Sequence, residues 1–199
     1  MVCLEPSLSA CQLARENCAP YPEVKIINTT FEEWELESSR FNAVLAATSF
    51  HWVLPEIRYT KAAAALKDKG FLILLTNMGA LPQDEVYQLL NEAYQTQDPF
   101  LAQYHTEERR TQSENLLRNG QDLIQSSLFK DLGSKQVVCE VTYSIDNYLM
   151  LLSTYSPYIA LDQEKRDSLF QSLRETLEAN WGKSFQASYL STFHIAQKI

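Results

Sequence analysis

The sequence has 199 residues, 45% of them hydrophobic, and a formal net charge of −8 from 17 basic and 25 acidic residues. This length suits one domain of ordinary size with room for a small lobe. The acidic balance disfavours a nucleic-acid binder, which needs a basic face, and no apolar run reaches the roughly 20 residues that a membrane helix requires.

The cysteines give no sign of a metal site. Four occur, at positions 3, 11, 18 and 139, without a CxxC pair or a nearby set of histidines. We therefore expect reduced thiols and no bound metal. No secretory signal peptide is recognisable in the sequence. Together these features favour a reducing, cytoplasmic compartment.

The first part of the chain predicts two short strands around one helix. Residues 1–4 are typical of the end of a strand, and residues 24–27 of a short second strand. Between them, Ser7 or Ser9 is suited to cap a helix that ends near residue 17. Strand, helix and strand in this order are the first sign of an α/β fold.

The most informative segment is residues 41–52, FNAVLAATSFHW. Its first seven residues are almost continuously apolar, which predicts a strand buried on both faces of a sheet. A predicted helix and a second apolar strand, residues 71–75, follow, so we expect a parallel pair with a right-handed crossover. Because ligands bind at the carboxyl ends of such strands, the turn at residues 48–52 is a candidate site.

The helix between these strands is predicted from Pro55, with strong support from four consecutive alanines at residues 62–65. Gly70 is suited to the left-handed conformation that ends a helix. Beyond residue 77 the regular alternation of strands and helices stops. Further helices are predicted at residues 85–96, 109–119, 121–129, 145–153 and 162–180, and strands at residues 136–144 and 184–195, the last of them antiparallel.

Four segments share the pattern of a known family. They are LEPS at residues 4–7, TFEEW at 30–34, the strand and FHW turn at 41–52, and the C-terminal part at 151–170 with TFHIA at 192–196. In this order they resemble the class I S-adenosylmethionine (SAM) dependent methyltransferases, in the branch called methyltransferase type 11. The resemblance covers nearly the whole chain.

The resemblance implies a Rossmann-like α/β fold, with a mostly parallel sheet, an antiparallel last strand and a helical cap. We expect residues 1–76 to form a partial SAM-binding core and residues 77–133 to form the cap. Residues 134–199 would then complete the sheet with the remaining strands and helices.

One defining element of the family is absent. Its first strand ends in a glycine-rich loop, GxGxG, whose backbone approaches the methionine part of the cofactor, and none of the five glycines here forms such a loop. We therefore expect an N-terminally truncated member that lacks the first strand. In the family that strand lies between the second and the fourth, so its absence predicts unpaired edges on both neighbours, or their direct pairing, and reduced stability.

The resemblance also implies where SAM would bind. Glu5 would accept hydrogen bonds from both ribose hydroxyls, because a carboxylate offers two acceptor oxygens. The alternative for Glu5 is an acid favoured by the dipole at a helix N-terminus. Ala47, Thr48 and Ser49 would line the methionine and its methyl sulfonium, where small side chains permit close approach.

The adenine would lie against the loop after the third family strand. There Thr30, Phe31 and Glu32 would cover the base with a ring and bind its amine with a polar group. The alternative is that Phe31 fills the core beside Trp34. Either arrangement is compatible with the sequence.

For the methyl acceptor, His51, Trp52 and Tyr155 are weak candidates. His51 invites a general-base role, but a hydrogen-bonded histidine at a helix start is the preferred interpretation. Methyl transfer from a sulfonium is a direct displacement in which positioning supplies much of the rate, so we assign no catalytic residue.

The predicted function is a SAM-dependent methyltransferase for a small-molecule acceptor, impaired by the missing segment. The alternative is a non-catalytic remnant or interaction protein with the same fold. A dinucleotide dehydrogenase is disfavoured, since it requires a GxGxxG motif that is equally absent. Neither nucleic acid nor membrane is expected as a partner, and the sequence leaves the acceptor and the oligomeric state open.

Overall fold

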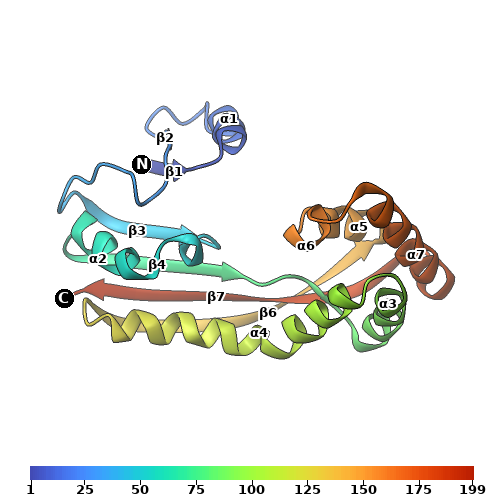
Figure 1. Ribbon diagram of the computed structural model, residues 1–199. Coiled ribbons are helices and arrows are strands. Elements are labelled where there is room, and N and C mark those ends of the chain that lie inside the picture. The colour runs from blue at the N-terminus through green and yellow to red at the C-terminus, as the bar shows by residue number, and fades with distance from the viewer. The chain divides into compact units, whose positions relative to one another are not determined.

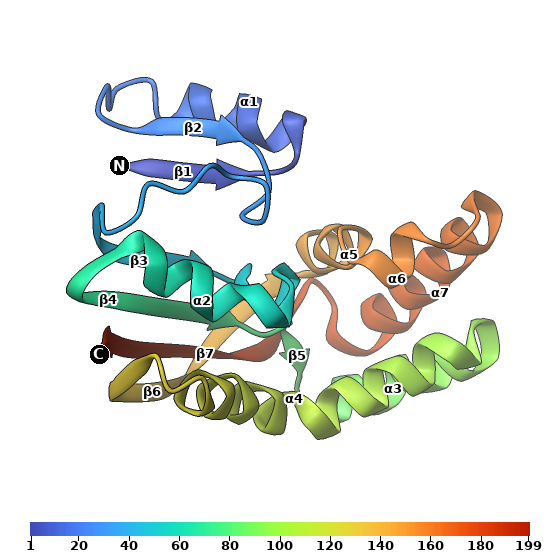
Figure 2. The ribbon, with the colours of Figure 1, turned by 60° about the vertical axis from the view of Figure 1, so that its left-hand side comes forward.

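The computed structural model describes the backbone of residues 1–199 and the side chains of residues 1–112 and 121–199. The chain divides into two compact units. Unit 1 consists of Met1–Leu75, Asp122–Gly133 and His194–Ile199, and unit 2 of Thr76–Gln121 and Ser134–Phe193. Figures 1 and 2 show the elements of both units.

Unit 1 begins with a parallel pair of short strands joined by a helix. Strand β1 (Val2–Glu5) pairs with β2 (Lys25–Asn28) from Val2 opposite Lys25 to Glu5 opposite Asn28. Helix α1 (Leu8–Asn17) lies between them in sequence, and the Ser7 side chain caps it by accepting from the Ala10 N–H. The cap that the sequence predicts at Ser7 is therefore formed.

A second parallel pair follows in the same unit. Strand β3 (Phe41–Ala47) pairs with β4 (Leu66–Asn77), and helix α2 (Pro55–Ala65) connects them after the short 3₁₀ helix η1 (Phe50–Trp52). The sheet continues in the order β3, β4, β7, with β6 (Phe129–Ser144) also paired to β7 (Ser184–Lys198). The predicted α/β fold with parallel pairs and an antiparallel last strand is confirmed.

The two parallel pairs of unit 1 belong to separate sheets. In the described backbone β1 pairs only with β2, and β3 pairs on one side only, with β4. Figure 2 shows all four strands running in the same direction, with no strand between β1 and β3. Of the two arrangements expected in the absence of a central strand, the structure therefore has the open edges and not direct pairing.

The prediction that β3 is buried on both faces is wrong. Its residues alternate, with Val44 and Ala46 half-buried and Leu45 59% exposed. On β4 the residues opposite Val44 and Ala46, Leu72 and Leu74, are buried. This face packs against α2 in a core of Tyr59, Ala62, Ala63, Leu66, Leu72, Leu74, Leu123, Phe129 and Ala196. Burial thus follows the face that α2 covers, and the apolar residues of the other face stay open to solvent.

The helix end predicted at Gly70 is also wrong. Helix α2 ends at Ala65, β4 begins at the next residue, and the left-handed residue is Lys69, with φ of 58°. Gly70 is required for space: a Cβ there would lie 2.9 Å from the Lys67 carbonyl oxygen and 3.2 Å from the Asn42 carbonyl oxygen. The glycine therefore allows close packing between β4 and β3.

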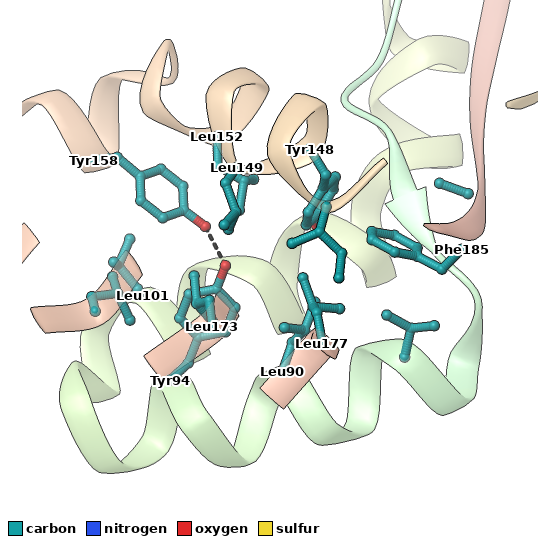
Figure 3. Close-up of a cluster of buried hydrophobic side chains, with 14 of the residues drawn as sticks. Leu90, Tyr94, Leu101, Tyr148, Leu149, Leu152, Tyr158, Leu173, Leu177 and Phe185 are labelled. Atoms are coloured by element: carbon teal, nitrogen blue, oxygen red, sulfur yellow. Dashed lines mark hydrogen bonds between the residues drawn. The ribbon is translucent and has the colours of Figure 1, made fainter. Parts of the chain in front are cut away.

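Unit 2 is mainly helical. It contains β5 (Leu81–Pro82), α3 (Asp84–Gln97), α5 (Ile145–Ser153), α6 (Ser156–Ile159) and α7 (Gln163–Trp181), with most of α4 (Pro99–Gln125). Buried leucines from α3, α5 and α7 form its core together with Tyr94 and Tyr158, as Figure 3 shows.

Two boundaries in this region differ from the sequence prediction. The two helices predicted at residues 109–119 and 121–129 are one helix, α4, of 27 residues that starts at Pro99. Strand β6 begins at Phe129, seven residues earlier than predicted. Helix α5 has its predicted bounds, because Ser144 caps it by accepting from the Asn147 N–H.

A matched pair of substitutions tests the one-sided burial of the β3–β4 pair. We expect Leu72→Ala to lower the free energy of unfolding by about 2–5 kcal/mol, since it leaves a cavity in the core. Leu45→Ala removes a mostly exposed side chain and should cost less than about 1 kcal/mol. Urea unfolding of both variants measures the difference, and equal losses would show that β3 is covered on both faces.

Substitutions at neighbouring positions test the geometry after α2. Lys69→Gly relieves the left-handed conformation of a residue with a Cβ and should stabilise the protein by about 1 kcal/mol. Gly70→Ala should destabilise it, because the new methyl group meets two carbonyl oxygens. Thermal melts of both variants measure the change in stability. A loss in Lys69→Gly together with a gain in Gly70→Ala would contradict the assignment of Lys69 as the left-handed residue.

Candidate functional site

A cleft of about 580 Å³ opens in unit 1 beyond the carboxyl ends of β1, β2 and β3. This volume is typical of small-molecule sites, and strand ends are where ligands bind in α/β folds. All seven residues that the sequence predicts to contact a cofactor line this one cleft: Glu5, Thr30, Phe31, Glu32, Ala47, Thr48 and Ser49.

Glu5 is held at the end of β1 by a short network. One of its carboxylate oxygens, Oε1, accepts from the Ser7 N–H at 2.8 Å. The Asn28 side-chain amide donates to the carbonyl oxygens of Glu5 and Pro6 at 3.0 and 2.9 Å, which ties the ends of β1 and β2 together. The carboxylate therefore stands at a fixed place on the cleft wall, where the Ser7 N–H donates to one of its two oxygens.

A compact turn at residues 30–34 forms another wall. The Thr30 hydroxyl oxygen accepts from the Glu33 N–H at 3.1 Å, and the Trp34 N–H donates to the Thr30 carbonyl oxygen at 3.1 Å. The ring of Phe31 stacks on Trp34 with centroids 6.2 Å apart. Phe31 thus both packs on Trp34 and lines the cleft, so the two alternatives that the sequence left open for it are compatible.

Glu32 is bound from two directions. Its Oε1 accepts from the Leu54 N–H at 3.0 Å, next to the start of α2. The Lys61 ammonium donates to the carbonyl oxygens of Glu32 and Trp34 at 2.7 Å each, which holds the turn against α2. Glu32 therefore has a structural role at the start of α2 as well as a place on the cleft wall.

The third wall is the turn after β3. Thr48 has a φ of 46°, a left-handed conformation that is rare for a β-branched residue. Its N–H donates to the Leu75 carbonyl oxygen at 2.8 Å, which extends the ladder with β4 past the last paired residue. Small side chains on both sides, Ala47 and Ser49, leave the backbone of this turn accessible to a ligand.

The three weak candidates for the acceptor site separate in the structure. Trp52 lines the cleft and is 77% exposed, so it is available to a ligand. His51 does not line the cleft; its ring packs on Trp52 with centroids 4.9 Å apart, and burial lowers its pKa. Tyr155 belongs to unit 2, where it lines a different and much smaller cavity.

Sequence reasoning missed part of the lining. The additional residues are Leu4, Pro6, Thr29, Ala46, Phe50 and Val53. All of them lie next to a predicted strand end or belong to the FHW turn and its neighbours. Their position in the sequence beside those ends could therefore have predicted them. Most of them have apolar side chains, as is usual among the residues that line ligand sites.

The cleft therefore offers three kinds of surface. A carboxylate at one strand end can accept hydrogen bonds from a pair of hydroxyl groups. An aromatic ring can cover a flat heterocycle, and a turn of small residues can approach a bulky or charged group closely.

Among the described residues, no helix is both long enough and apolar enough to cross a membrane.

No family model and no curated protein matches the sequence. The fold, by contrast, is similar to solved structures. A candidate type II methyltransferase from Anaeromyxobacter dehalogenans has a TM-score of 0.67 and 15% identity, over 98% of this chain and 79% of that chain. A candidate methyltransferase from Bacillus halodurans has a TM-score of 0.54 and 15% identity, over 99% and 82%.

The YcgJ protein of Bacillus subtilis is similar as well, with a TM-score of 0.53 and 12% identity over 99% of this chain and 81% of that chain. At these identities the likeness concerns the fold. The chain has the Rossmann-like fold of the class I SAM-dependent methyltransferases, so the fold that the sequence resemblance implied is confirmed.

The lowered pKa of His51 predicts a pH dependence of stability. Partial burial of the ring disfavours the imidazolium, so the unfolded chain binds its proton more readily than the folded one. Stability should therefore be complete above the ordinary histidine pKa of about 6.5 and decrease as the pH falls below it.

Urea unfolding at pH 7.5 and at pH 5.5 measures this decrease, and His51→Gln should make it smaller. His194, whose pKa burial also lowers, remains in the variant, so part of the decrease should persist. If stability falls equally with pH in His51→Gln and in the natural sequence, His51 does not contribute to the pH dependence of stability.

Proposed function

We propose that the protein is a SAM-dependent methyltransferase that acts on a small-molecule acceptor by direct displacement, in the cytoplasm. The observation that carries this proposal is the single cleft at the carboxyl ends of three strands, onto which all seven cofactor candidates converge. The methyltransferase fold supports the same reading. The four cysteines are free, which is compatible with a reducing compartment.

The residues of the cleft fit the parts of this cofactor. Glu5 would accept from the ribose hydroxyls, since one of its oxygens is free of the Ser7 contact. Phe31 would cover the adenine, and Thr30 and Glu32 would lie at its edge.

On the other side, the turn at Ala47–Ser49 would approach the methionine part. SAM supplies an activated methyl group on a sulfonium. The protein's contribution is to hold donor and acceptor in line and to exclude water, and we assign no residue as a catalytic acid or base.

We further propose that cofactor binding is weak and transfer slow. The five glycines, at positions 70, 79, 120, 133 and 182, form no GxGxG loop. A loop of that kind presents backbone N–H groups at close range, and the described residues that line the cleft include no glycine. The methionine part would therefore be held by the 47–49 turn without that support.

A second candidate function is a binding or interaction protein that keeps the fold without turnover. It is favoured by one specific observation, the open edges of β1 and β3 in unit 1. Unpaired strand edges are common sites for the addition of a further strand from a partner.

Calorimetric titration with S-adenosylhomocysteine, the demethylated product, tests the cofactor proposal. We expect saturable binding, and Glu5→Gln should weaken it by about tenfold to a hundredfold because charge-assisted hydrogen bonds are lost. Glu16→Gln is the matched control: Glu16 is an exposed acid on α1 outside the cleft, and its loss should leave the affinity unchanged.

Absence of binding in the natural sequence, or equal losses in the two variants, would refute the proposed site. Transfer of labelled methyl groups from SAM to a mixture of small metabolites then separates the two functions. Labelled product supports the enzyme, whereas binding without any labelled product supports the second candidate.

A further inference from the structure

Unit 2 contains a small cavity that the methyltransferase proposal does not use. Its volume is about 20 Å³, enough for one water molecule or a group of similar size. Residues of α3, α4 and α5 and the segment around β5 surround it: Ala80, Leu81, Pro82, Tyr87, Leu90, Tyr94, His105, Glu108, Tyr148, Leu152 and Tyr155.

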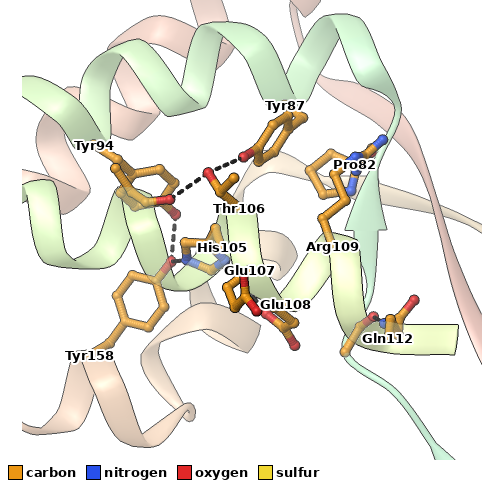
Figure 4. Close-up of polar contacts among 12 residues, drawn as sticks. Pro82, Tyr87, Tyr94, His105, Thr106, Glu107, Glu108, Arg109, Gln112 and Tyr158 are labelled. Atoms are coloured by element: carbon orange, nitrogen blue, oxygen red, sulfur yellow. Dashed lines mark hydrogen bonds and ion pairs between the residues drawn. The ribbon is translucent and has the colours of Figure 1, made fainter. Parts of the chain in front are cut away.

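A chain of hydrogen bonds, drawn in Figure 4, includes two residues that line the cavity, Tyr94 and His105. The hydroxyls of Tyr94 and Tyr158 lie 2.5 Å apart, and the Tyr158 hydroxyl lies 2.6 Å from Nε2 of His105. The other ring nitrogen, Nδ1, lies 3.6 Å from Oε2 of Glu108. This chain fixes the orientation of the imidazole and places the carboxylate at its far end.

A glycine lets the carboxylate reach this position. A Cβ on Gly79 would lie 2.9 Å from Oε1 of Glu108 and 3.6 Å from the Tyr155 hydroxyl oxygen. Both polar groups therefore converge beside the Gly79 backbone, where any other residue would displace the carboxylate. Glu108 is largely buried, with 19% of its side chain exposed.

The described lining of the cavity holds a carboxylate and no permanently cationic side chain. This described lining contains one carboxylate, one imidazole and four tyrosines, but no lysine or arginine. The nearest guanidinium in sequence, that of Arg109, pairs with Asp84, donates to the Pro82 carbonyl oxygen and lies over the Tyr87 ring. Burial raises the pKa of Tyr155, and the negative charge of Glu108 raises it further.

We propose that this cavity binds the head group of a small ammonium ion, with Glu108 as its counter-ion and the surrounding tyrosines as its aromatic wall. A carboxylate that is largely buried attracts a cation more strongly than one in water, and the faces of aromatic rings add to that attraction. An anion would be repelled by Glu108, and a neutral molecule of the same size would gain neither interaction. The volume limits the group that enters to a primary ammonium group, and methylammonium is the smallest organic ion that carries one.

Titration of the ¹⁵N-labelled protein with methylammonium chloride, at constant ionic strength, tests this site by NMR. We expect saturable shifts of the amides of Gly79, Glu108 and Tyr155. Methanol, which is similar in size but neutral, should bind at least about tenfold more weakly. The proposal does not depend on the methyl-transfer function, because no methyl donor is present in the measurement.

The variant Glu108→Gln keeps the shape of the side chain and removes its charge, and it should weaken methylammonium binding by about tenfold or more. Glu107→Gln is the matched control, since Glu107 is exposed and pairs with Arg110 outside the cavity. Its affinity should match that of the natural sequence.

Equal binding of methanol and methylammonium, no saturable shift, or an unchanged affinity in Glu108→Gln would overturn the proposal. If Glu108→Gln does not fold, the preference of the natural sequence for methylammonium over methanol still decides the question. None of these outcomes affects the cofactor cleft, which is measured with a different ligand.

Discussion

The parallel pairing of β3 with β4 is the constraint on which unit 1 depends. Its register places Val44 opposite Leu72 and Ala46 opposite Leu74, so that one face of the pair packs against α2. The same register brings the Thr48 N–H to the Leu75 carbonyl oxygen and holds the next residues in a tight left-handed turn. Because apolar burial fixes the pair and the pair fixes the turn, the core determines where the cleft has its small-residue wall.

The other walls depend on hydrogen bonds of a different pair of strands. Asn28 joins the ends of β1 and β2, and this contact sets the place of Glu5. Lys61 holds the 30–34 turn against α2 from the opposite direction. In this arrangement β1 and β3 each have an unpaired edge, and one apolar face of the sheet has exposed residues such as Leu45. Natural sheets usually cover such edges and faces.

In unit 2 the core is built by helices, and it encloses polar groups that bind one another. Tyr94 and Tyr158 lie among buried leucines, and each hydroxyl is hydrogen-bonded, as buried polar groups require (Figure 3). The chain continues to His105 and reaches Glu108 at the cavity. The carboxylate lies beside the imidazole and the tyrosines of the cavity, whose described lining holds no lysine or arginine, and the proposed ammonium site rests on this arrangement.

The sequence by itself determined the elements whose signals are local. The Ser7 cap, the apolar periodicity of residues 145–153, the apolar run of β3 and the order of strands and helices were sufficient to predict α1, α5, the fold class and the strand ends around the cleft. The tertiary structure alone decided which face of β3 is buried and that Lys69, not Gly70, has the left-handed conformation. It also decided that the Glu32 carboxylate accepts from the Leu54 N–H and that His51 lies outside the cleft. Caps and periodicity act within a few residues of sequence, whereas coverage and space are set by partners far along the chain.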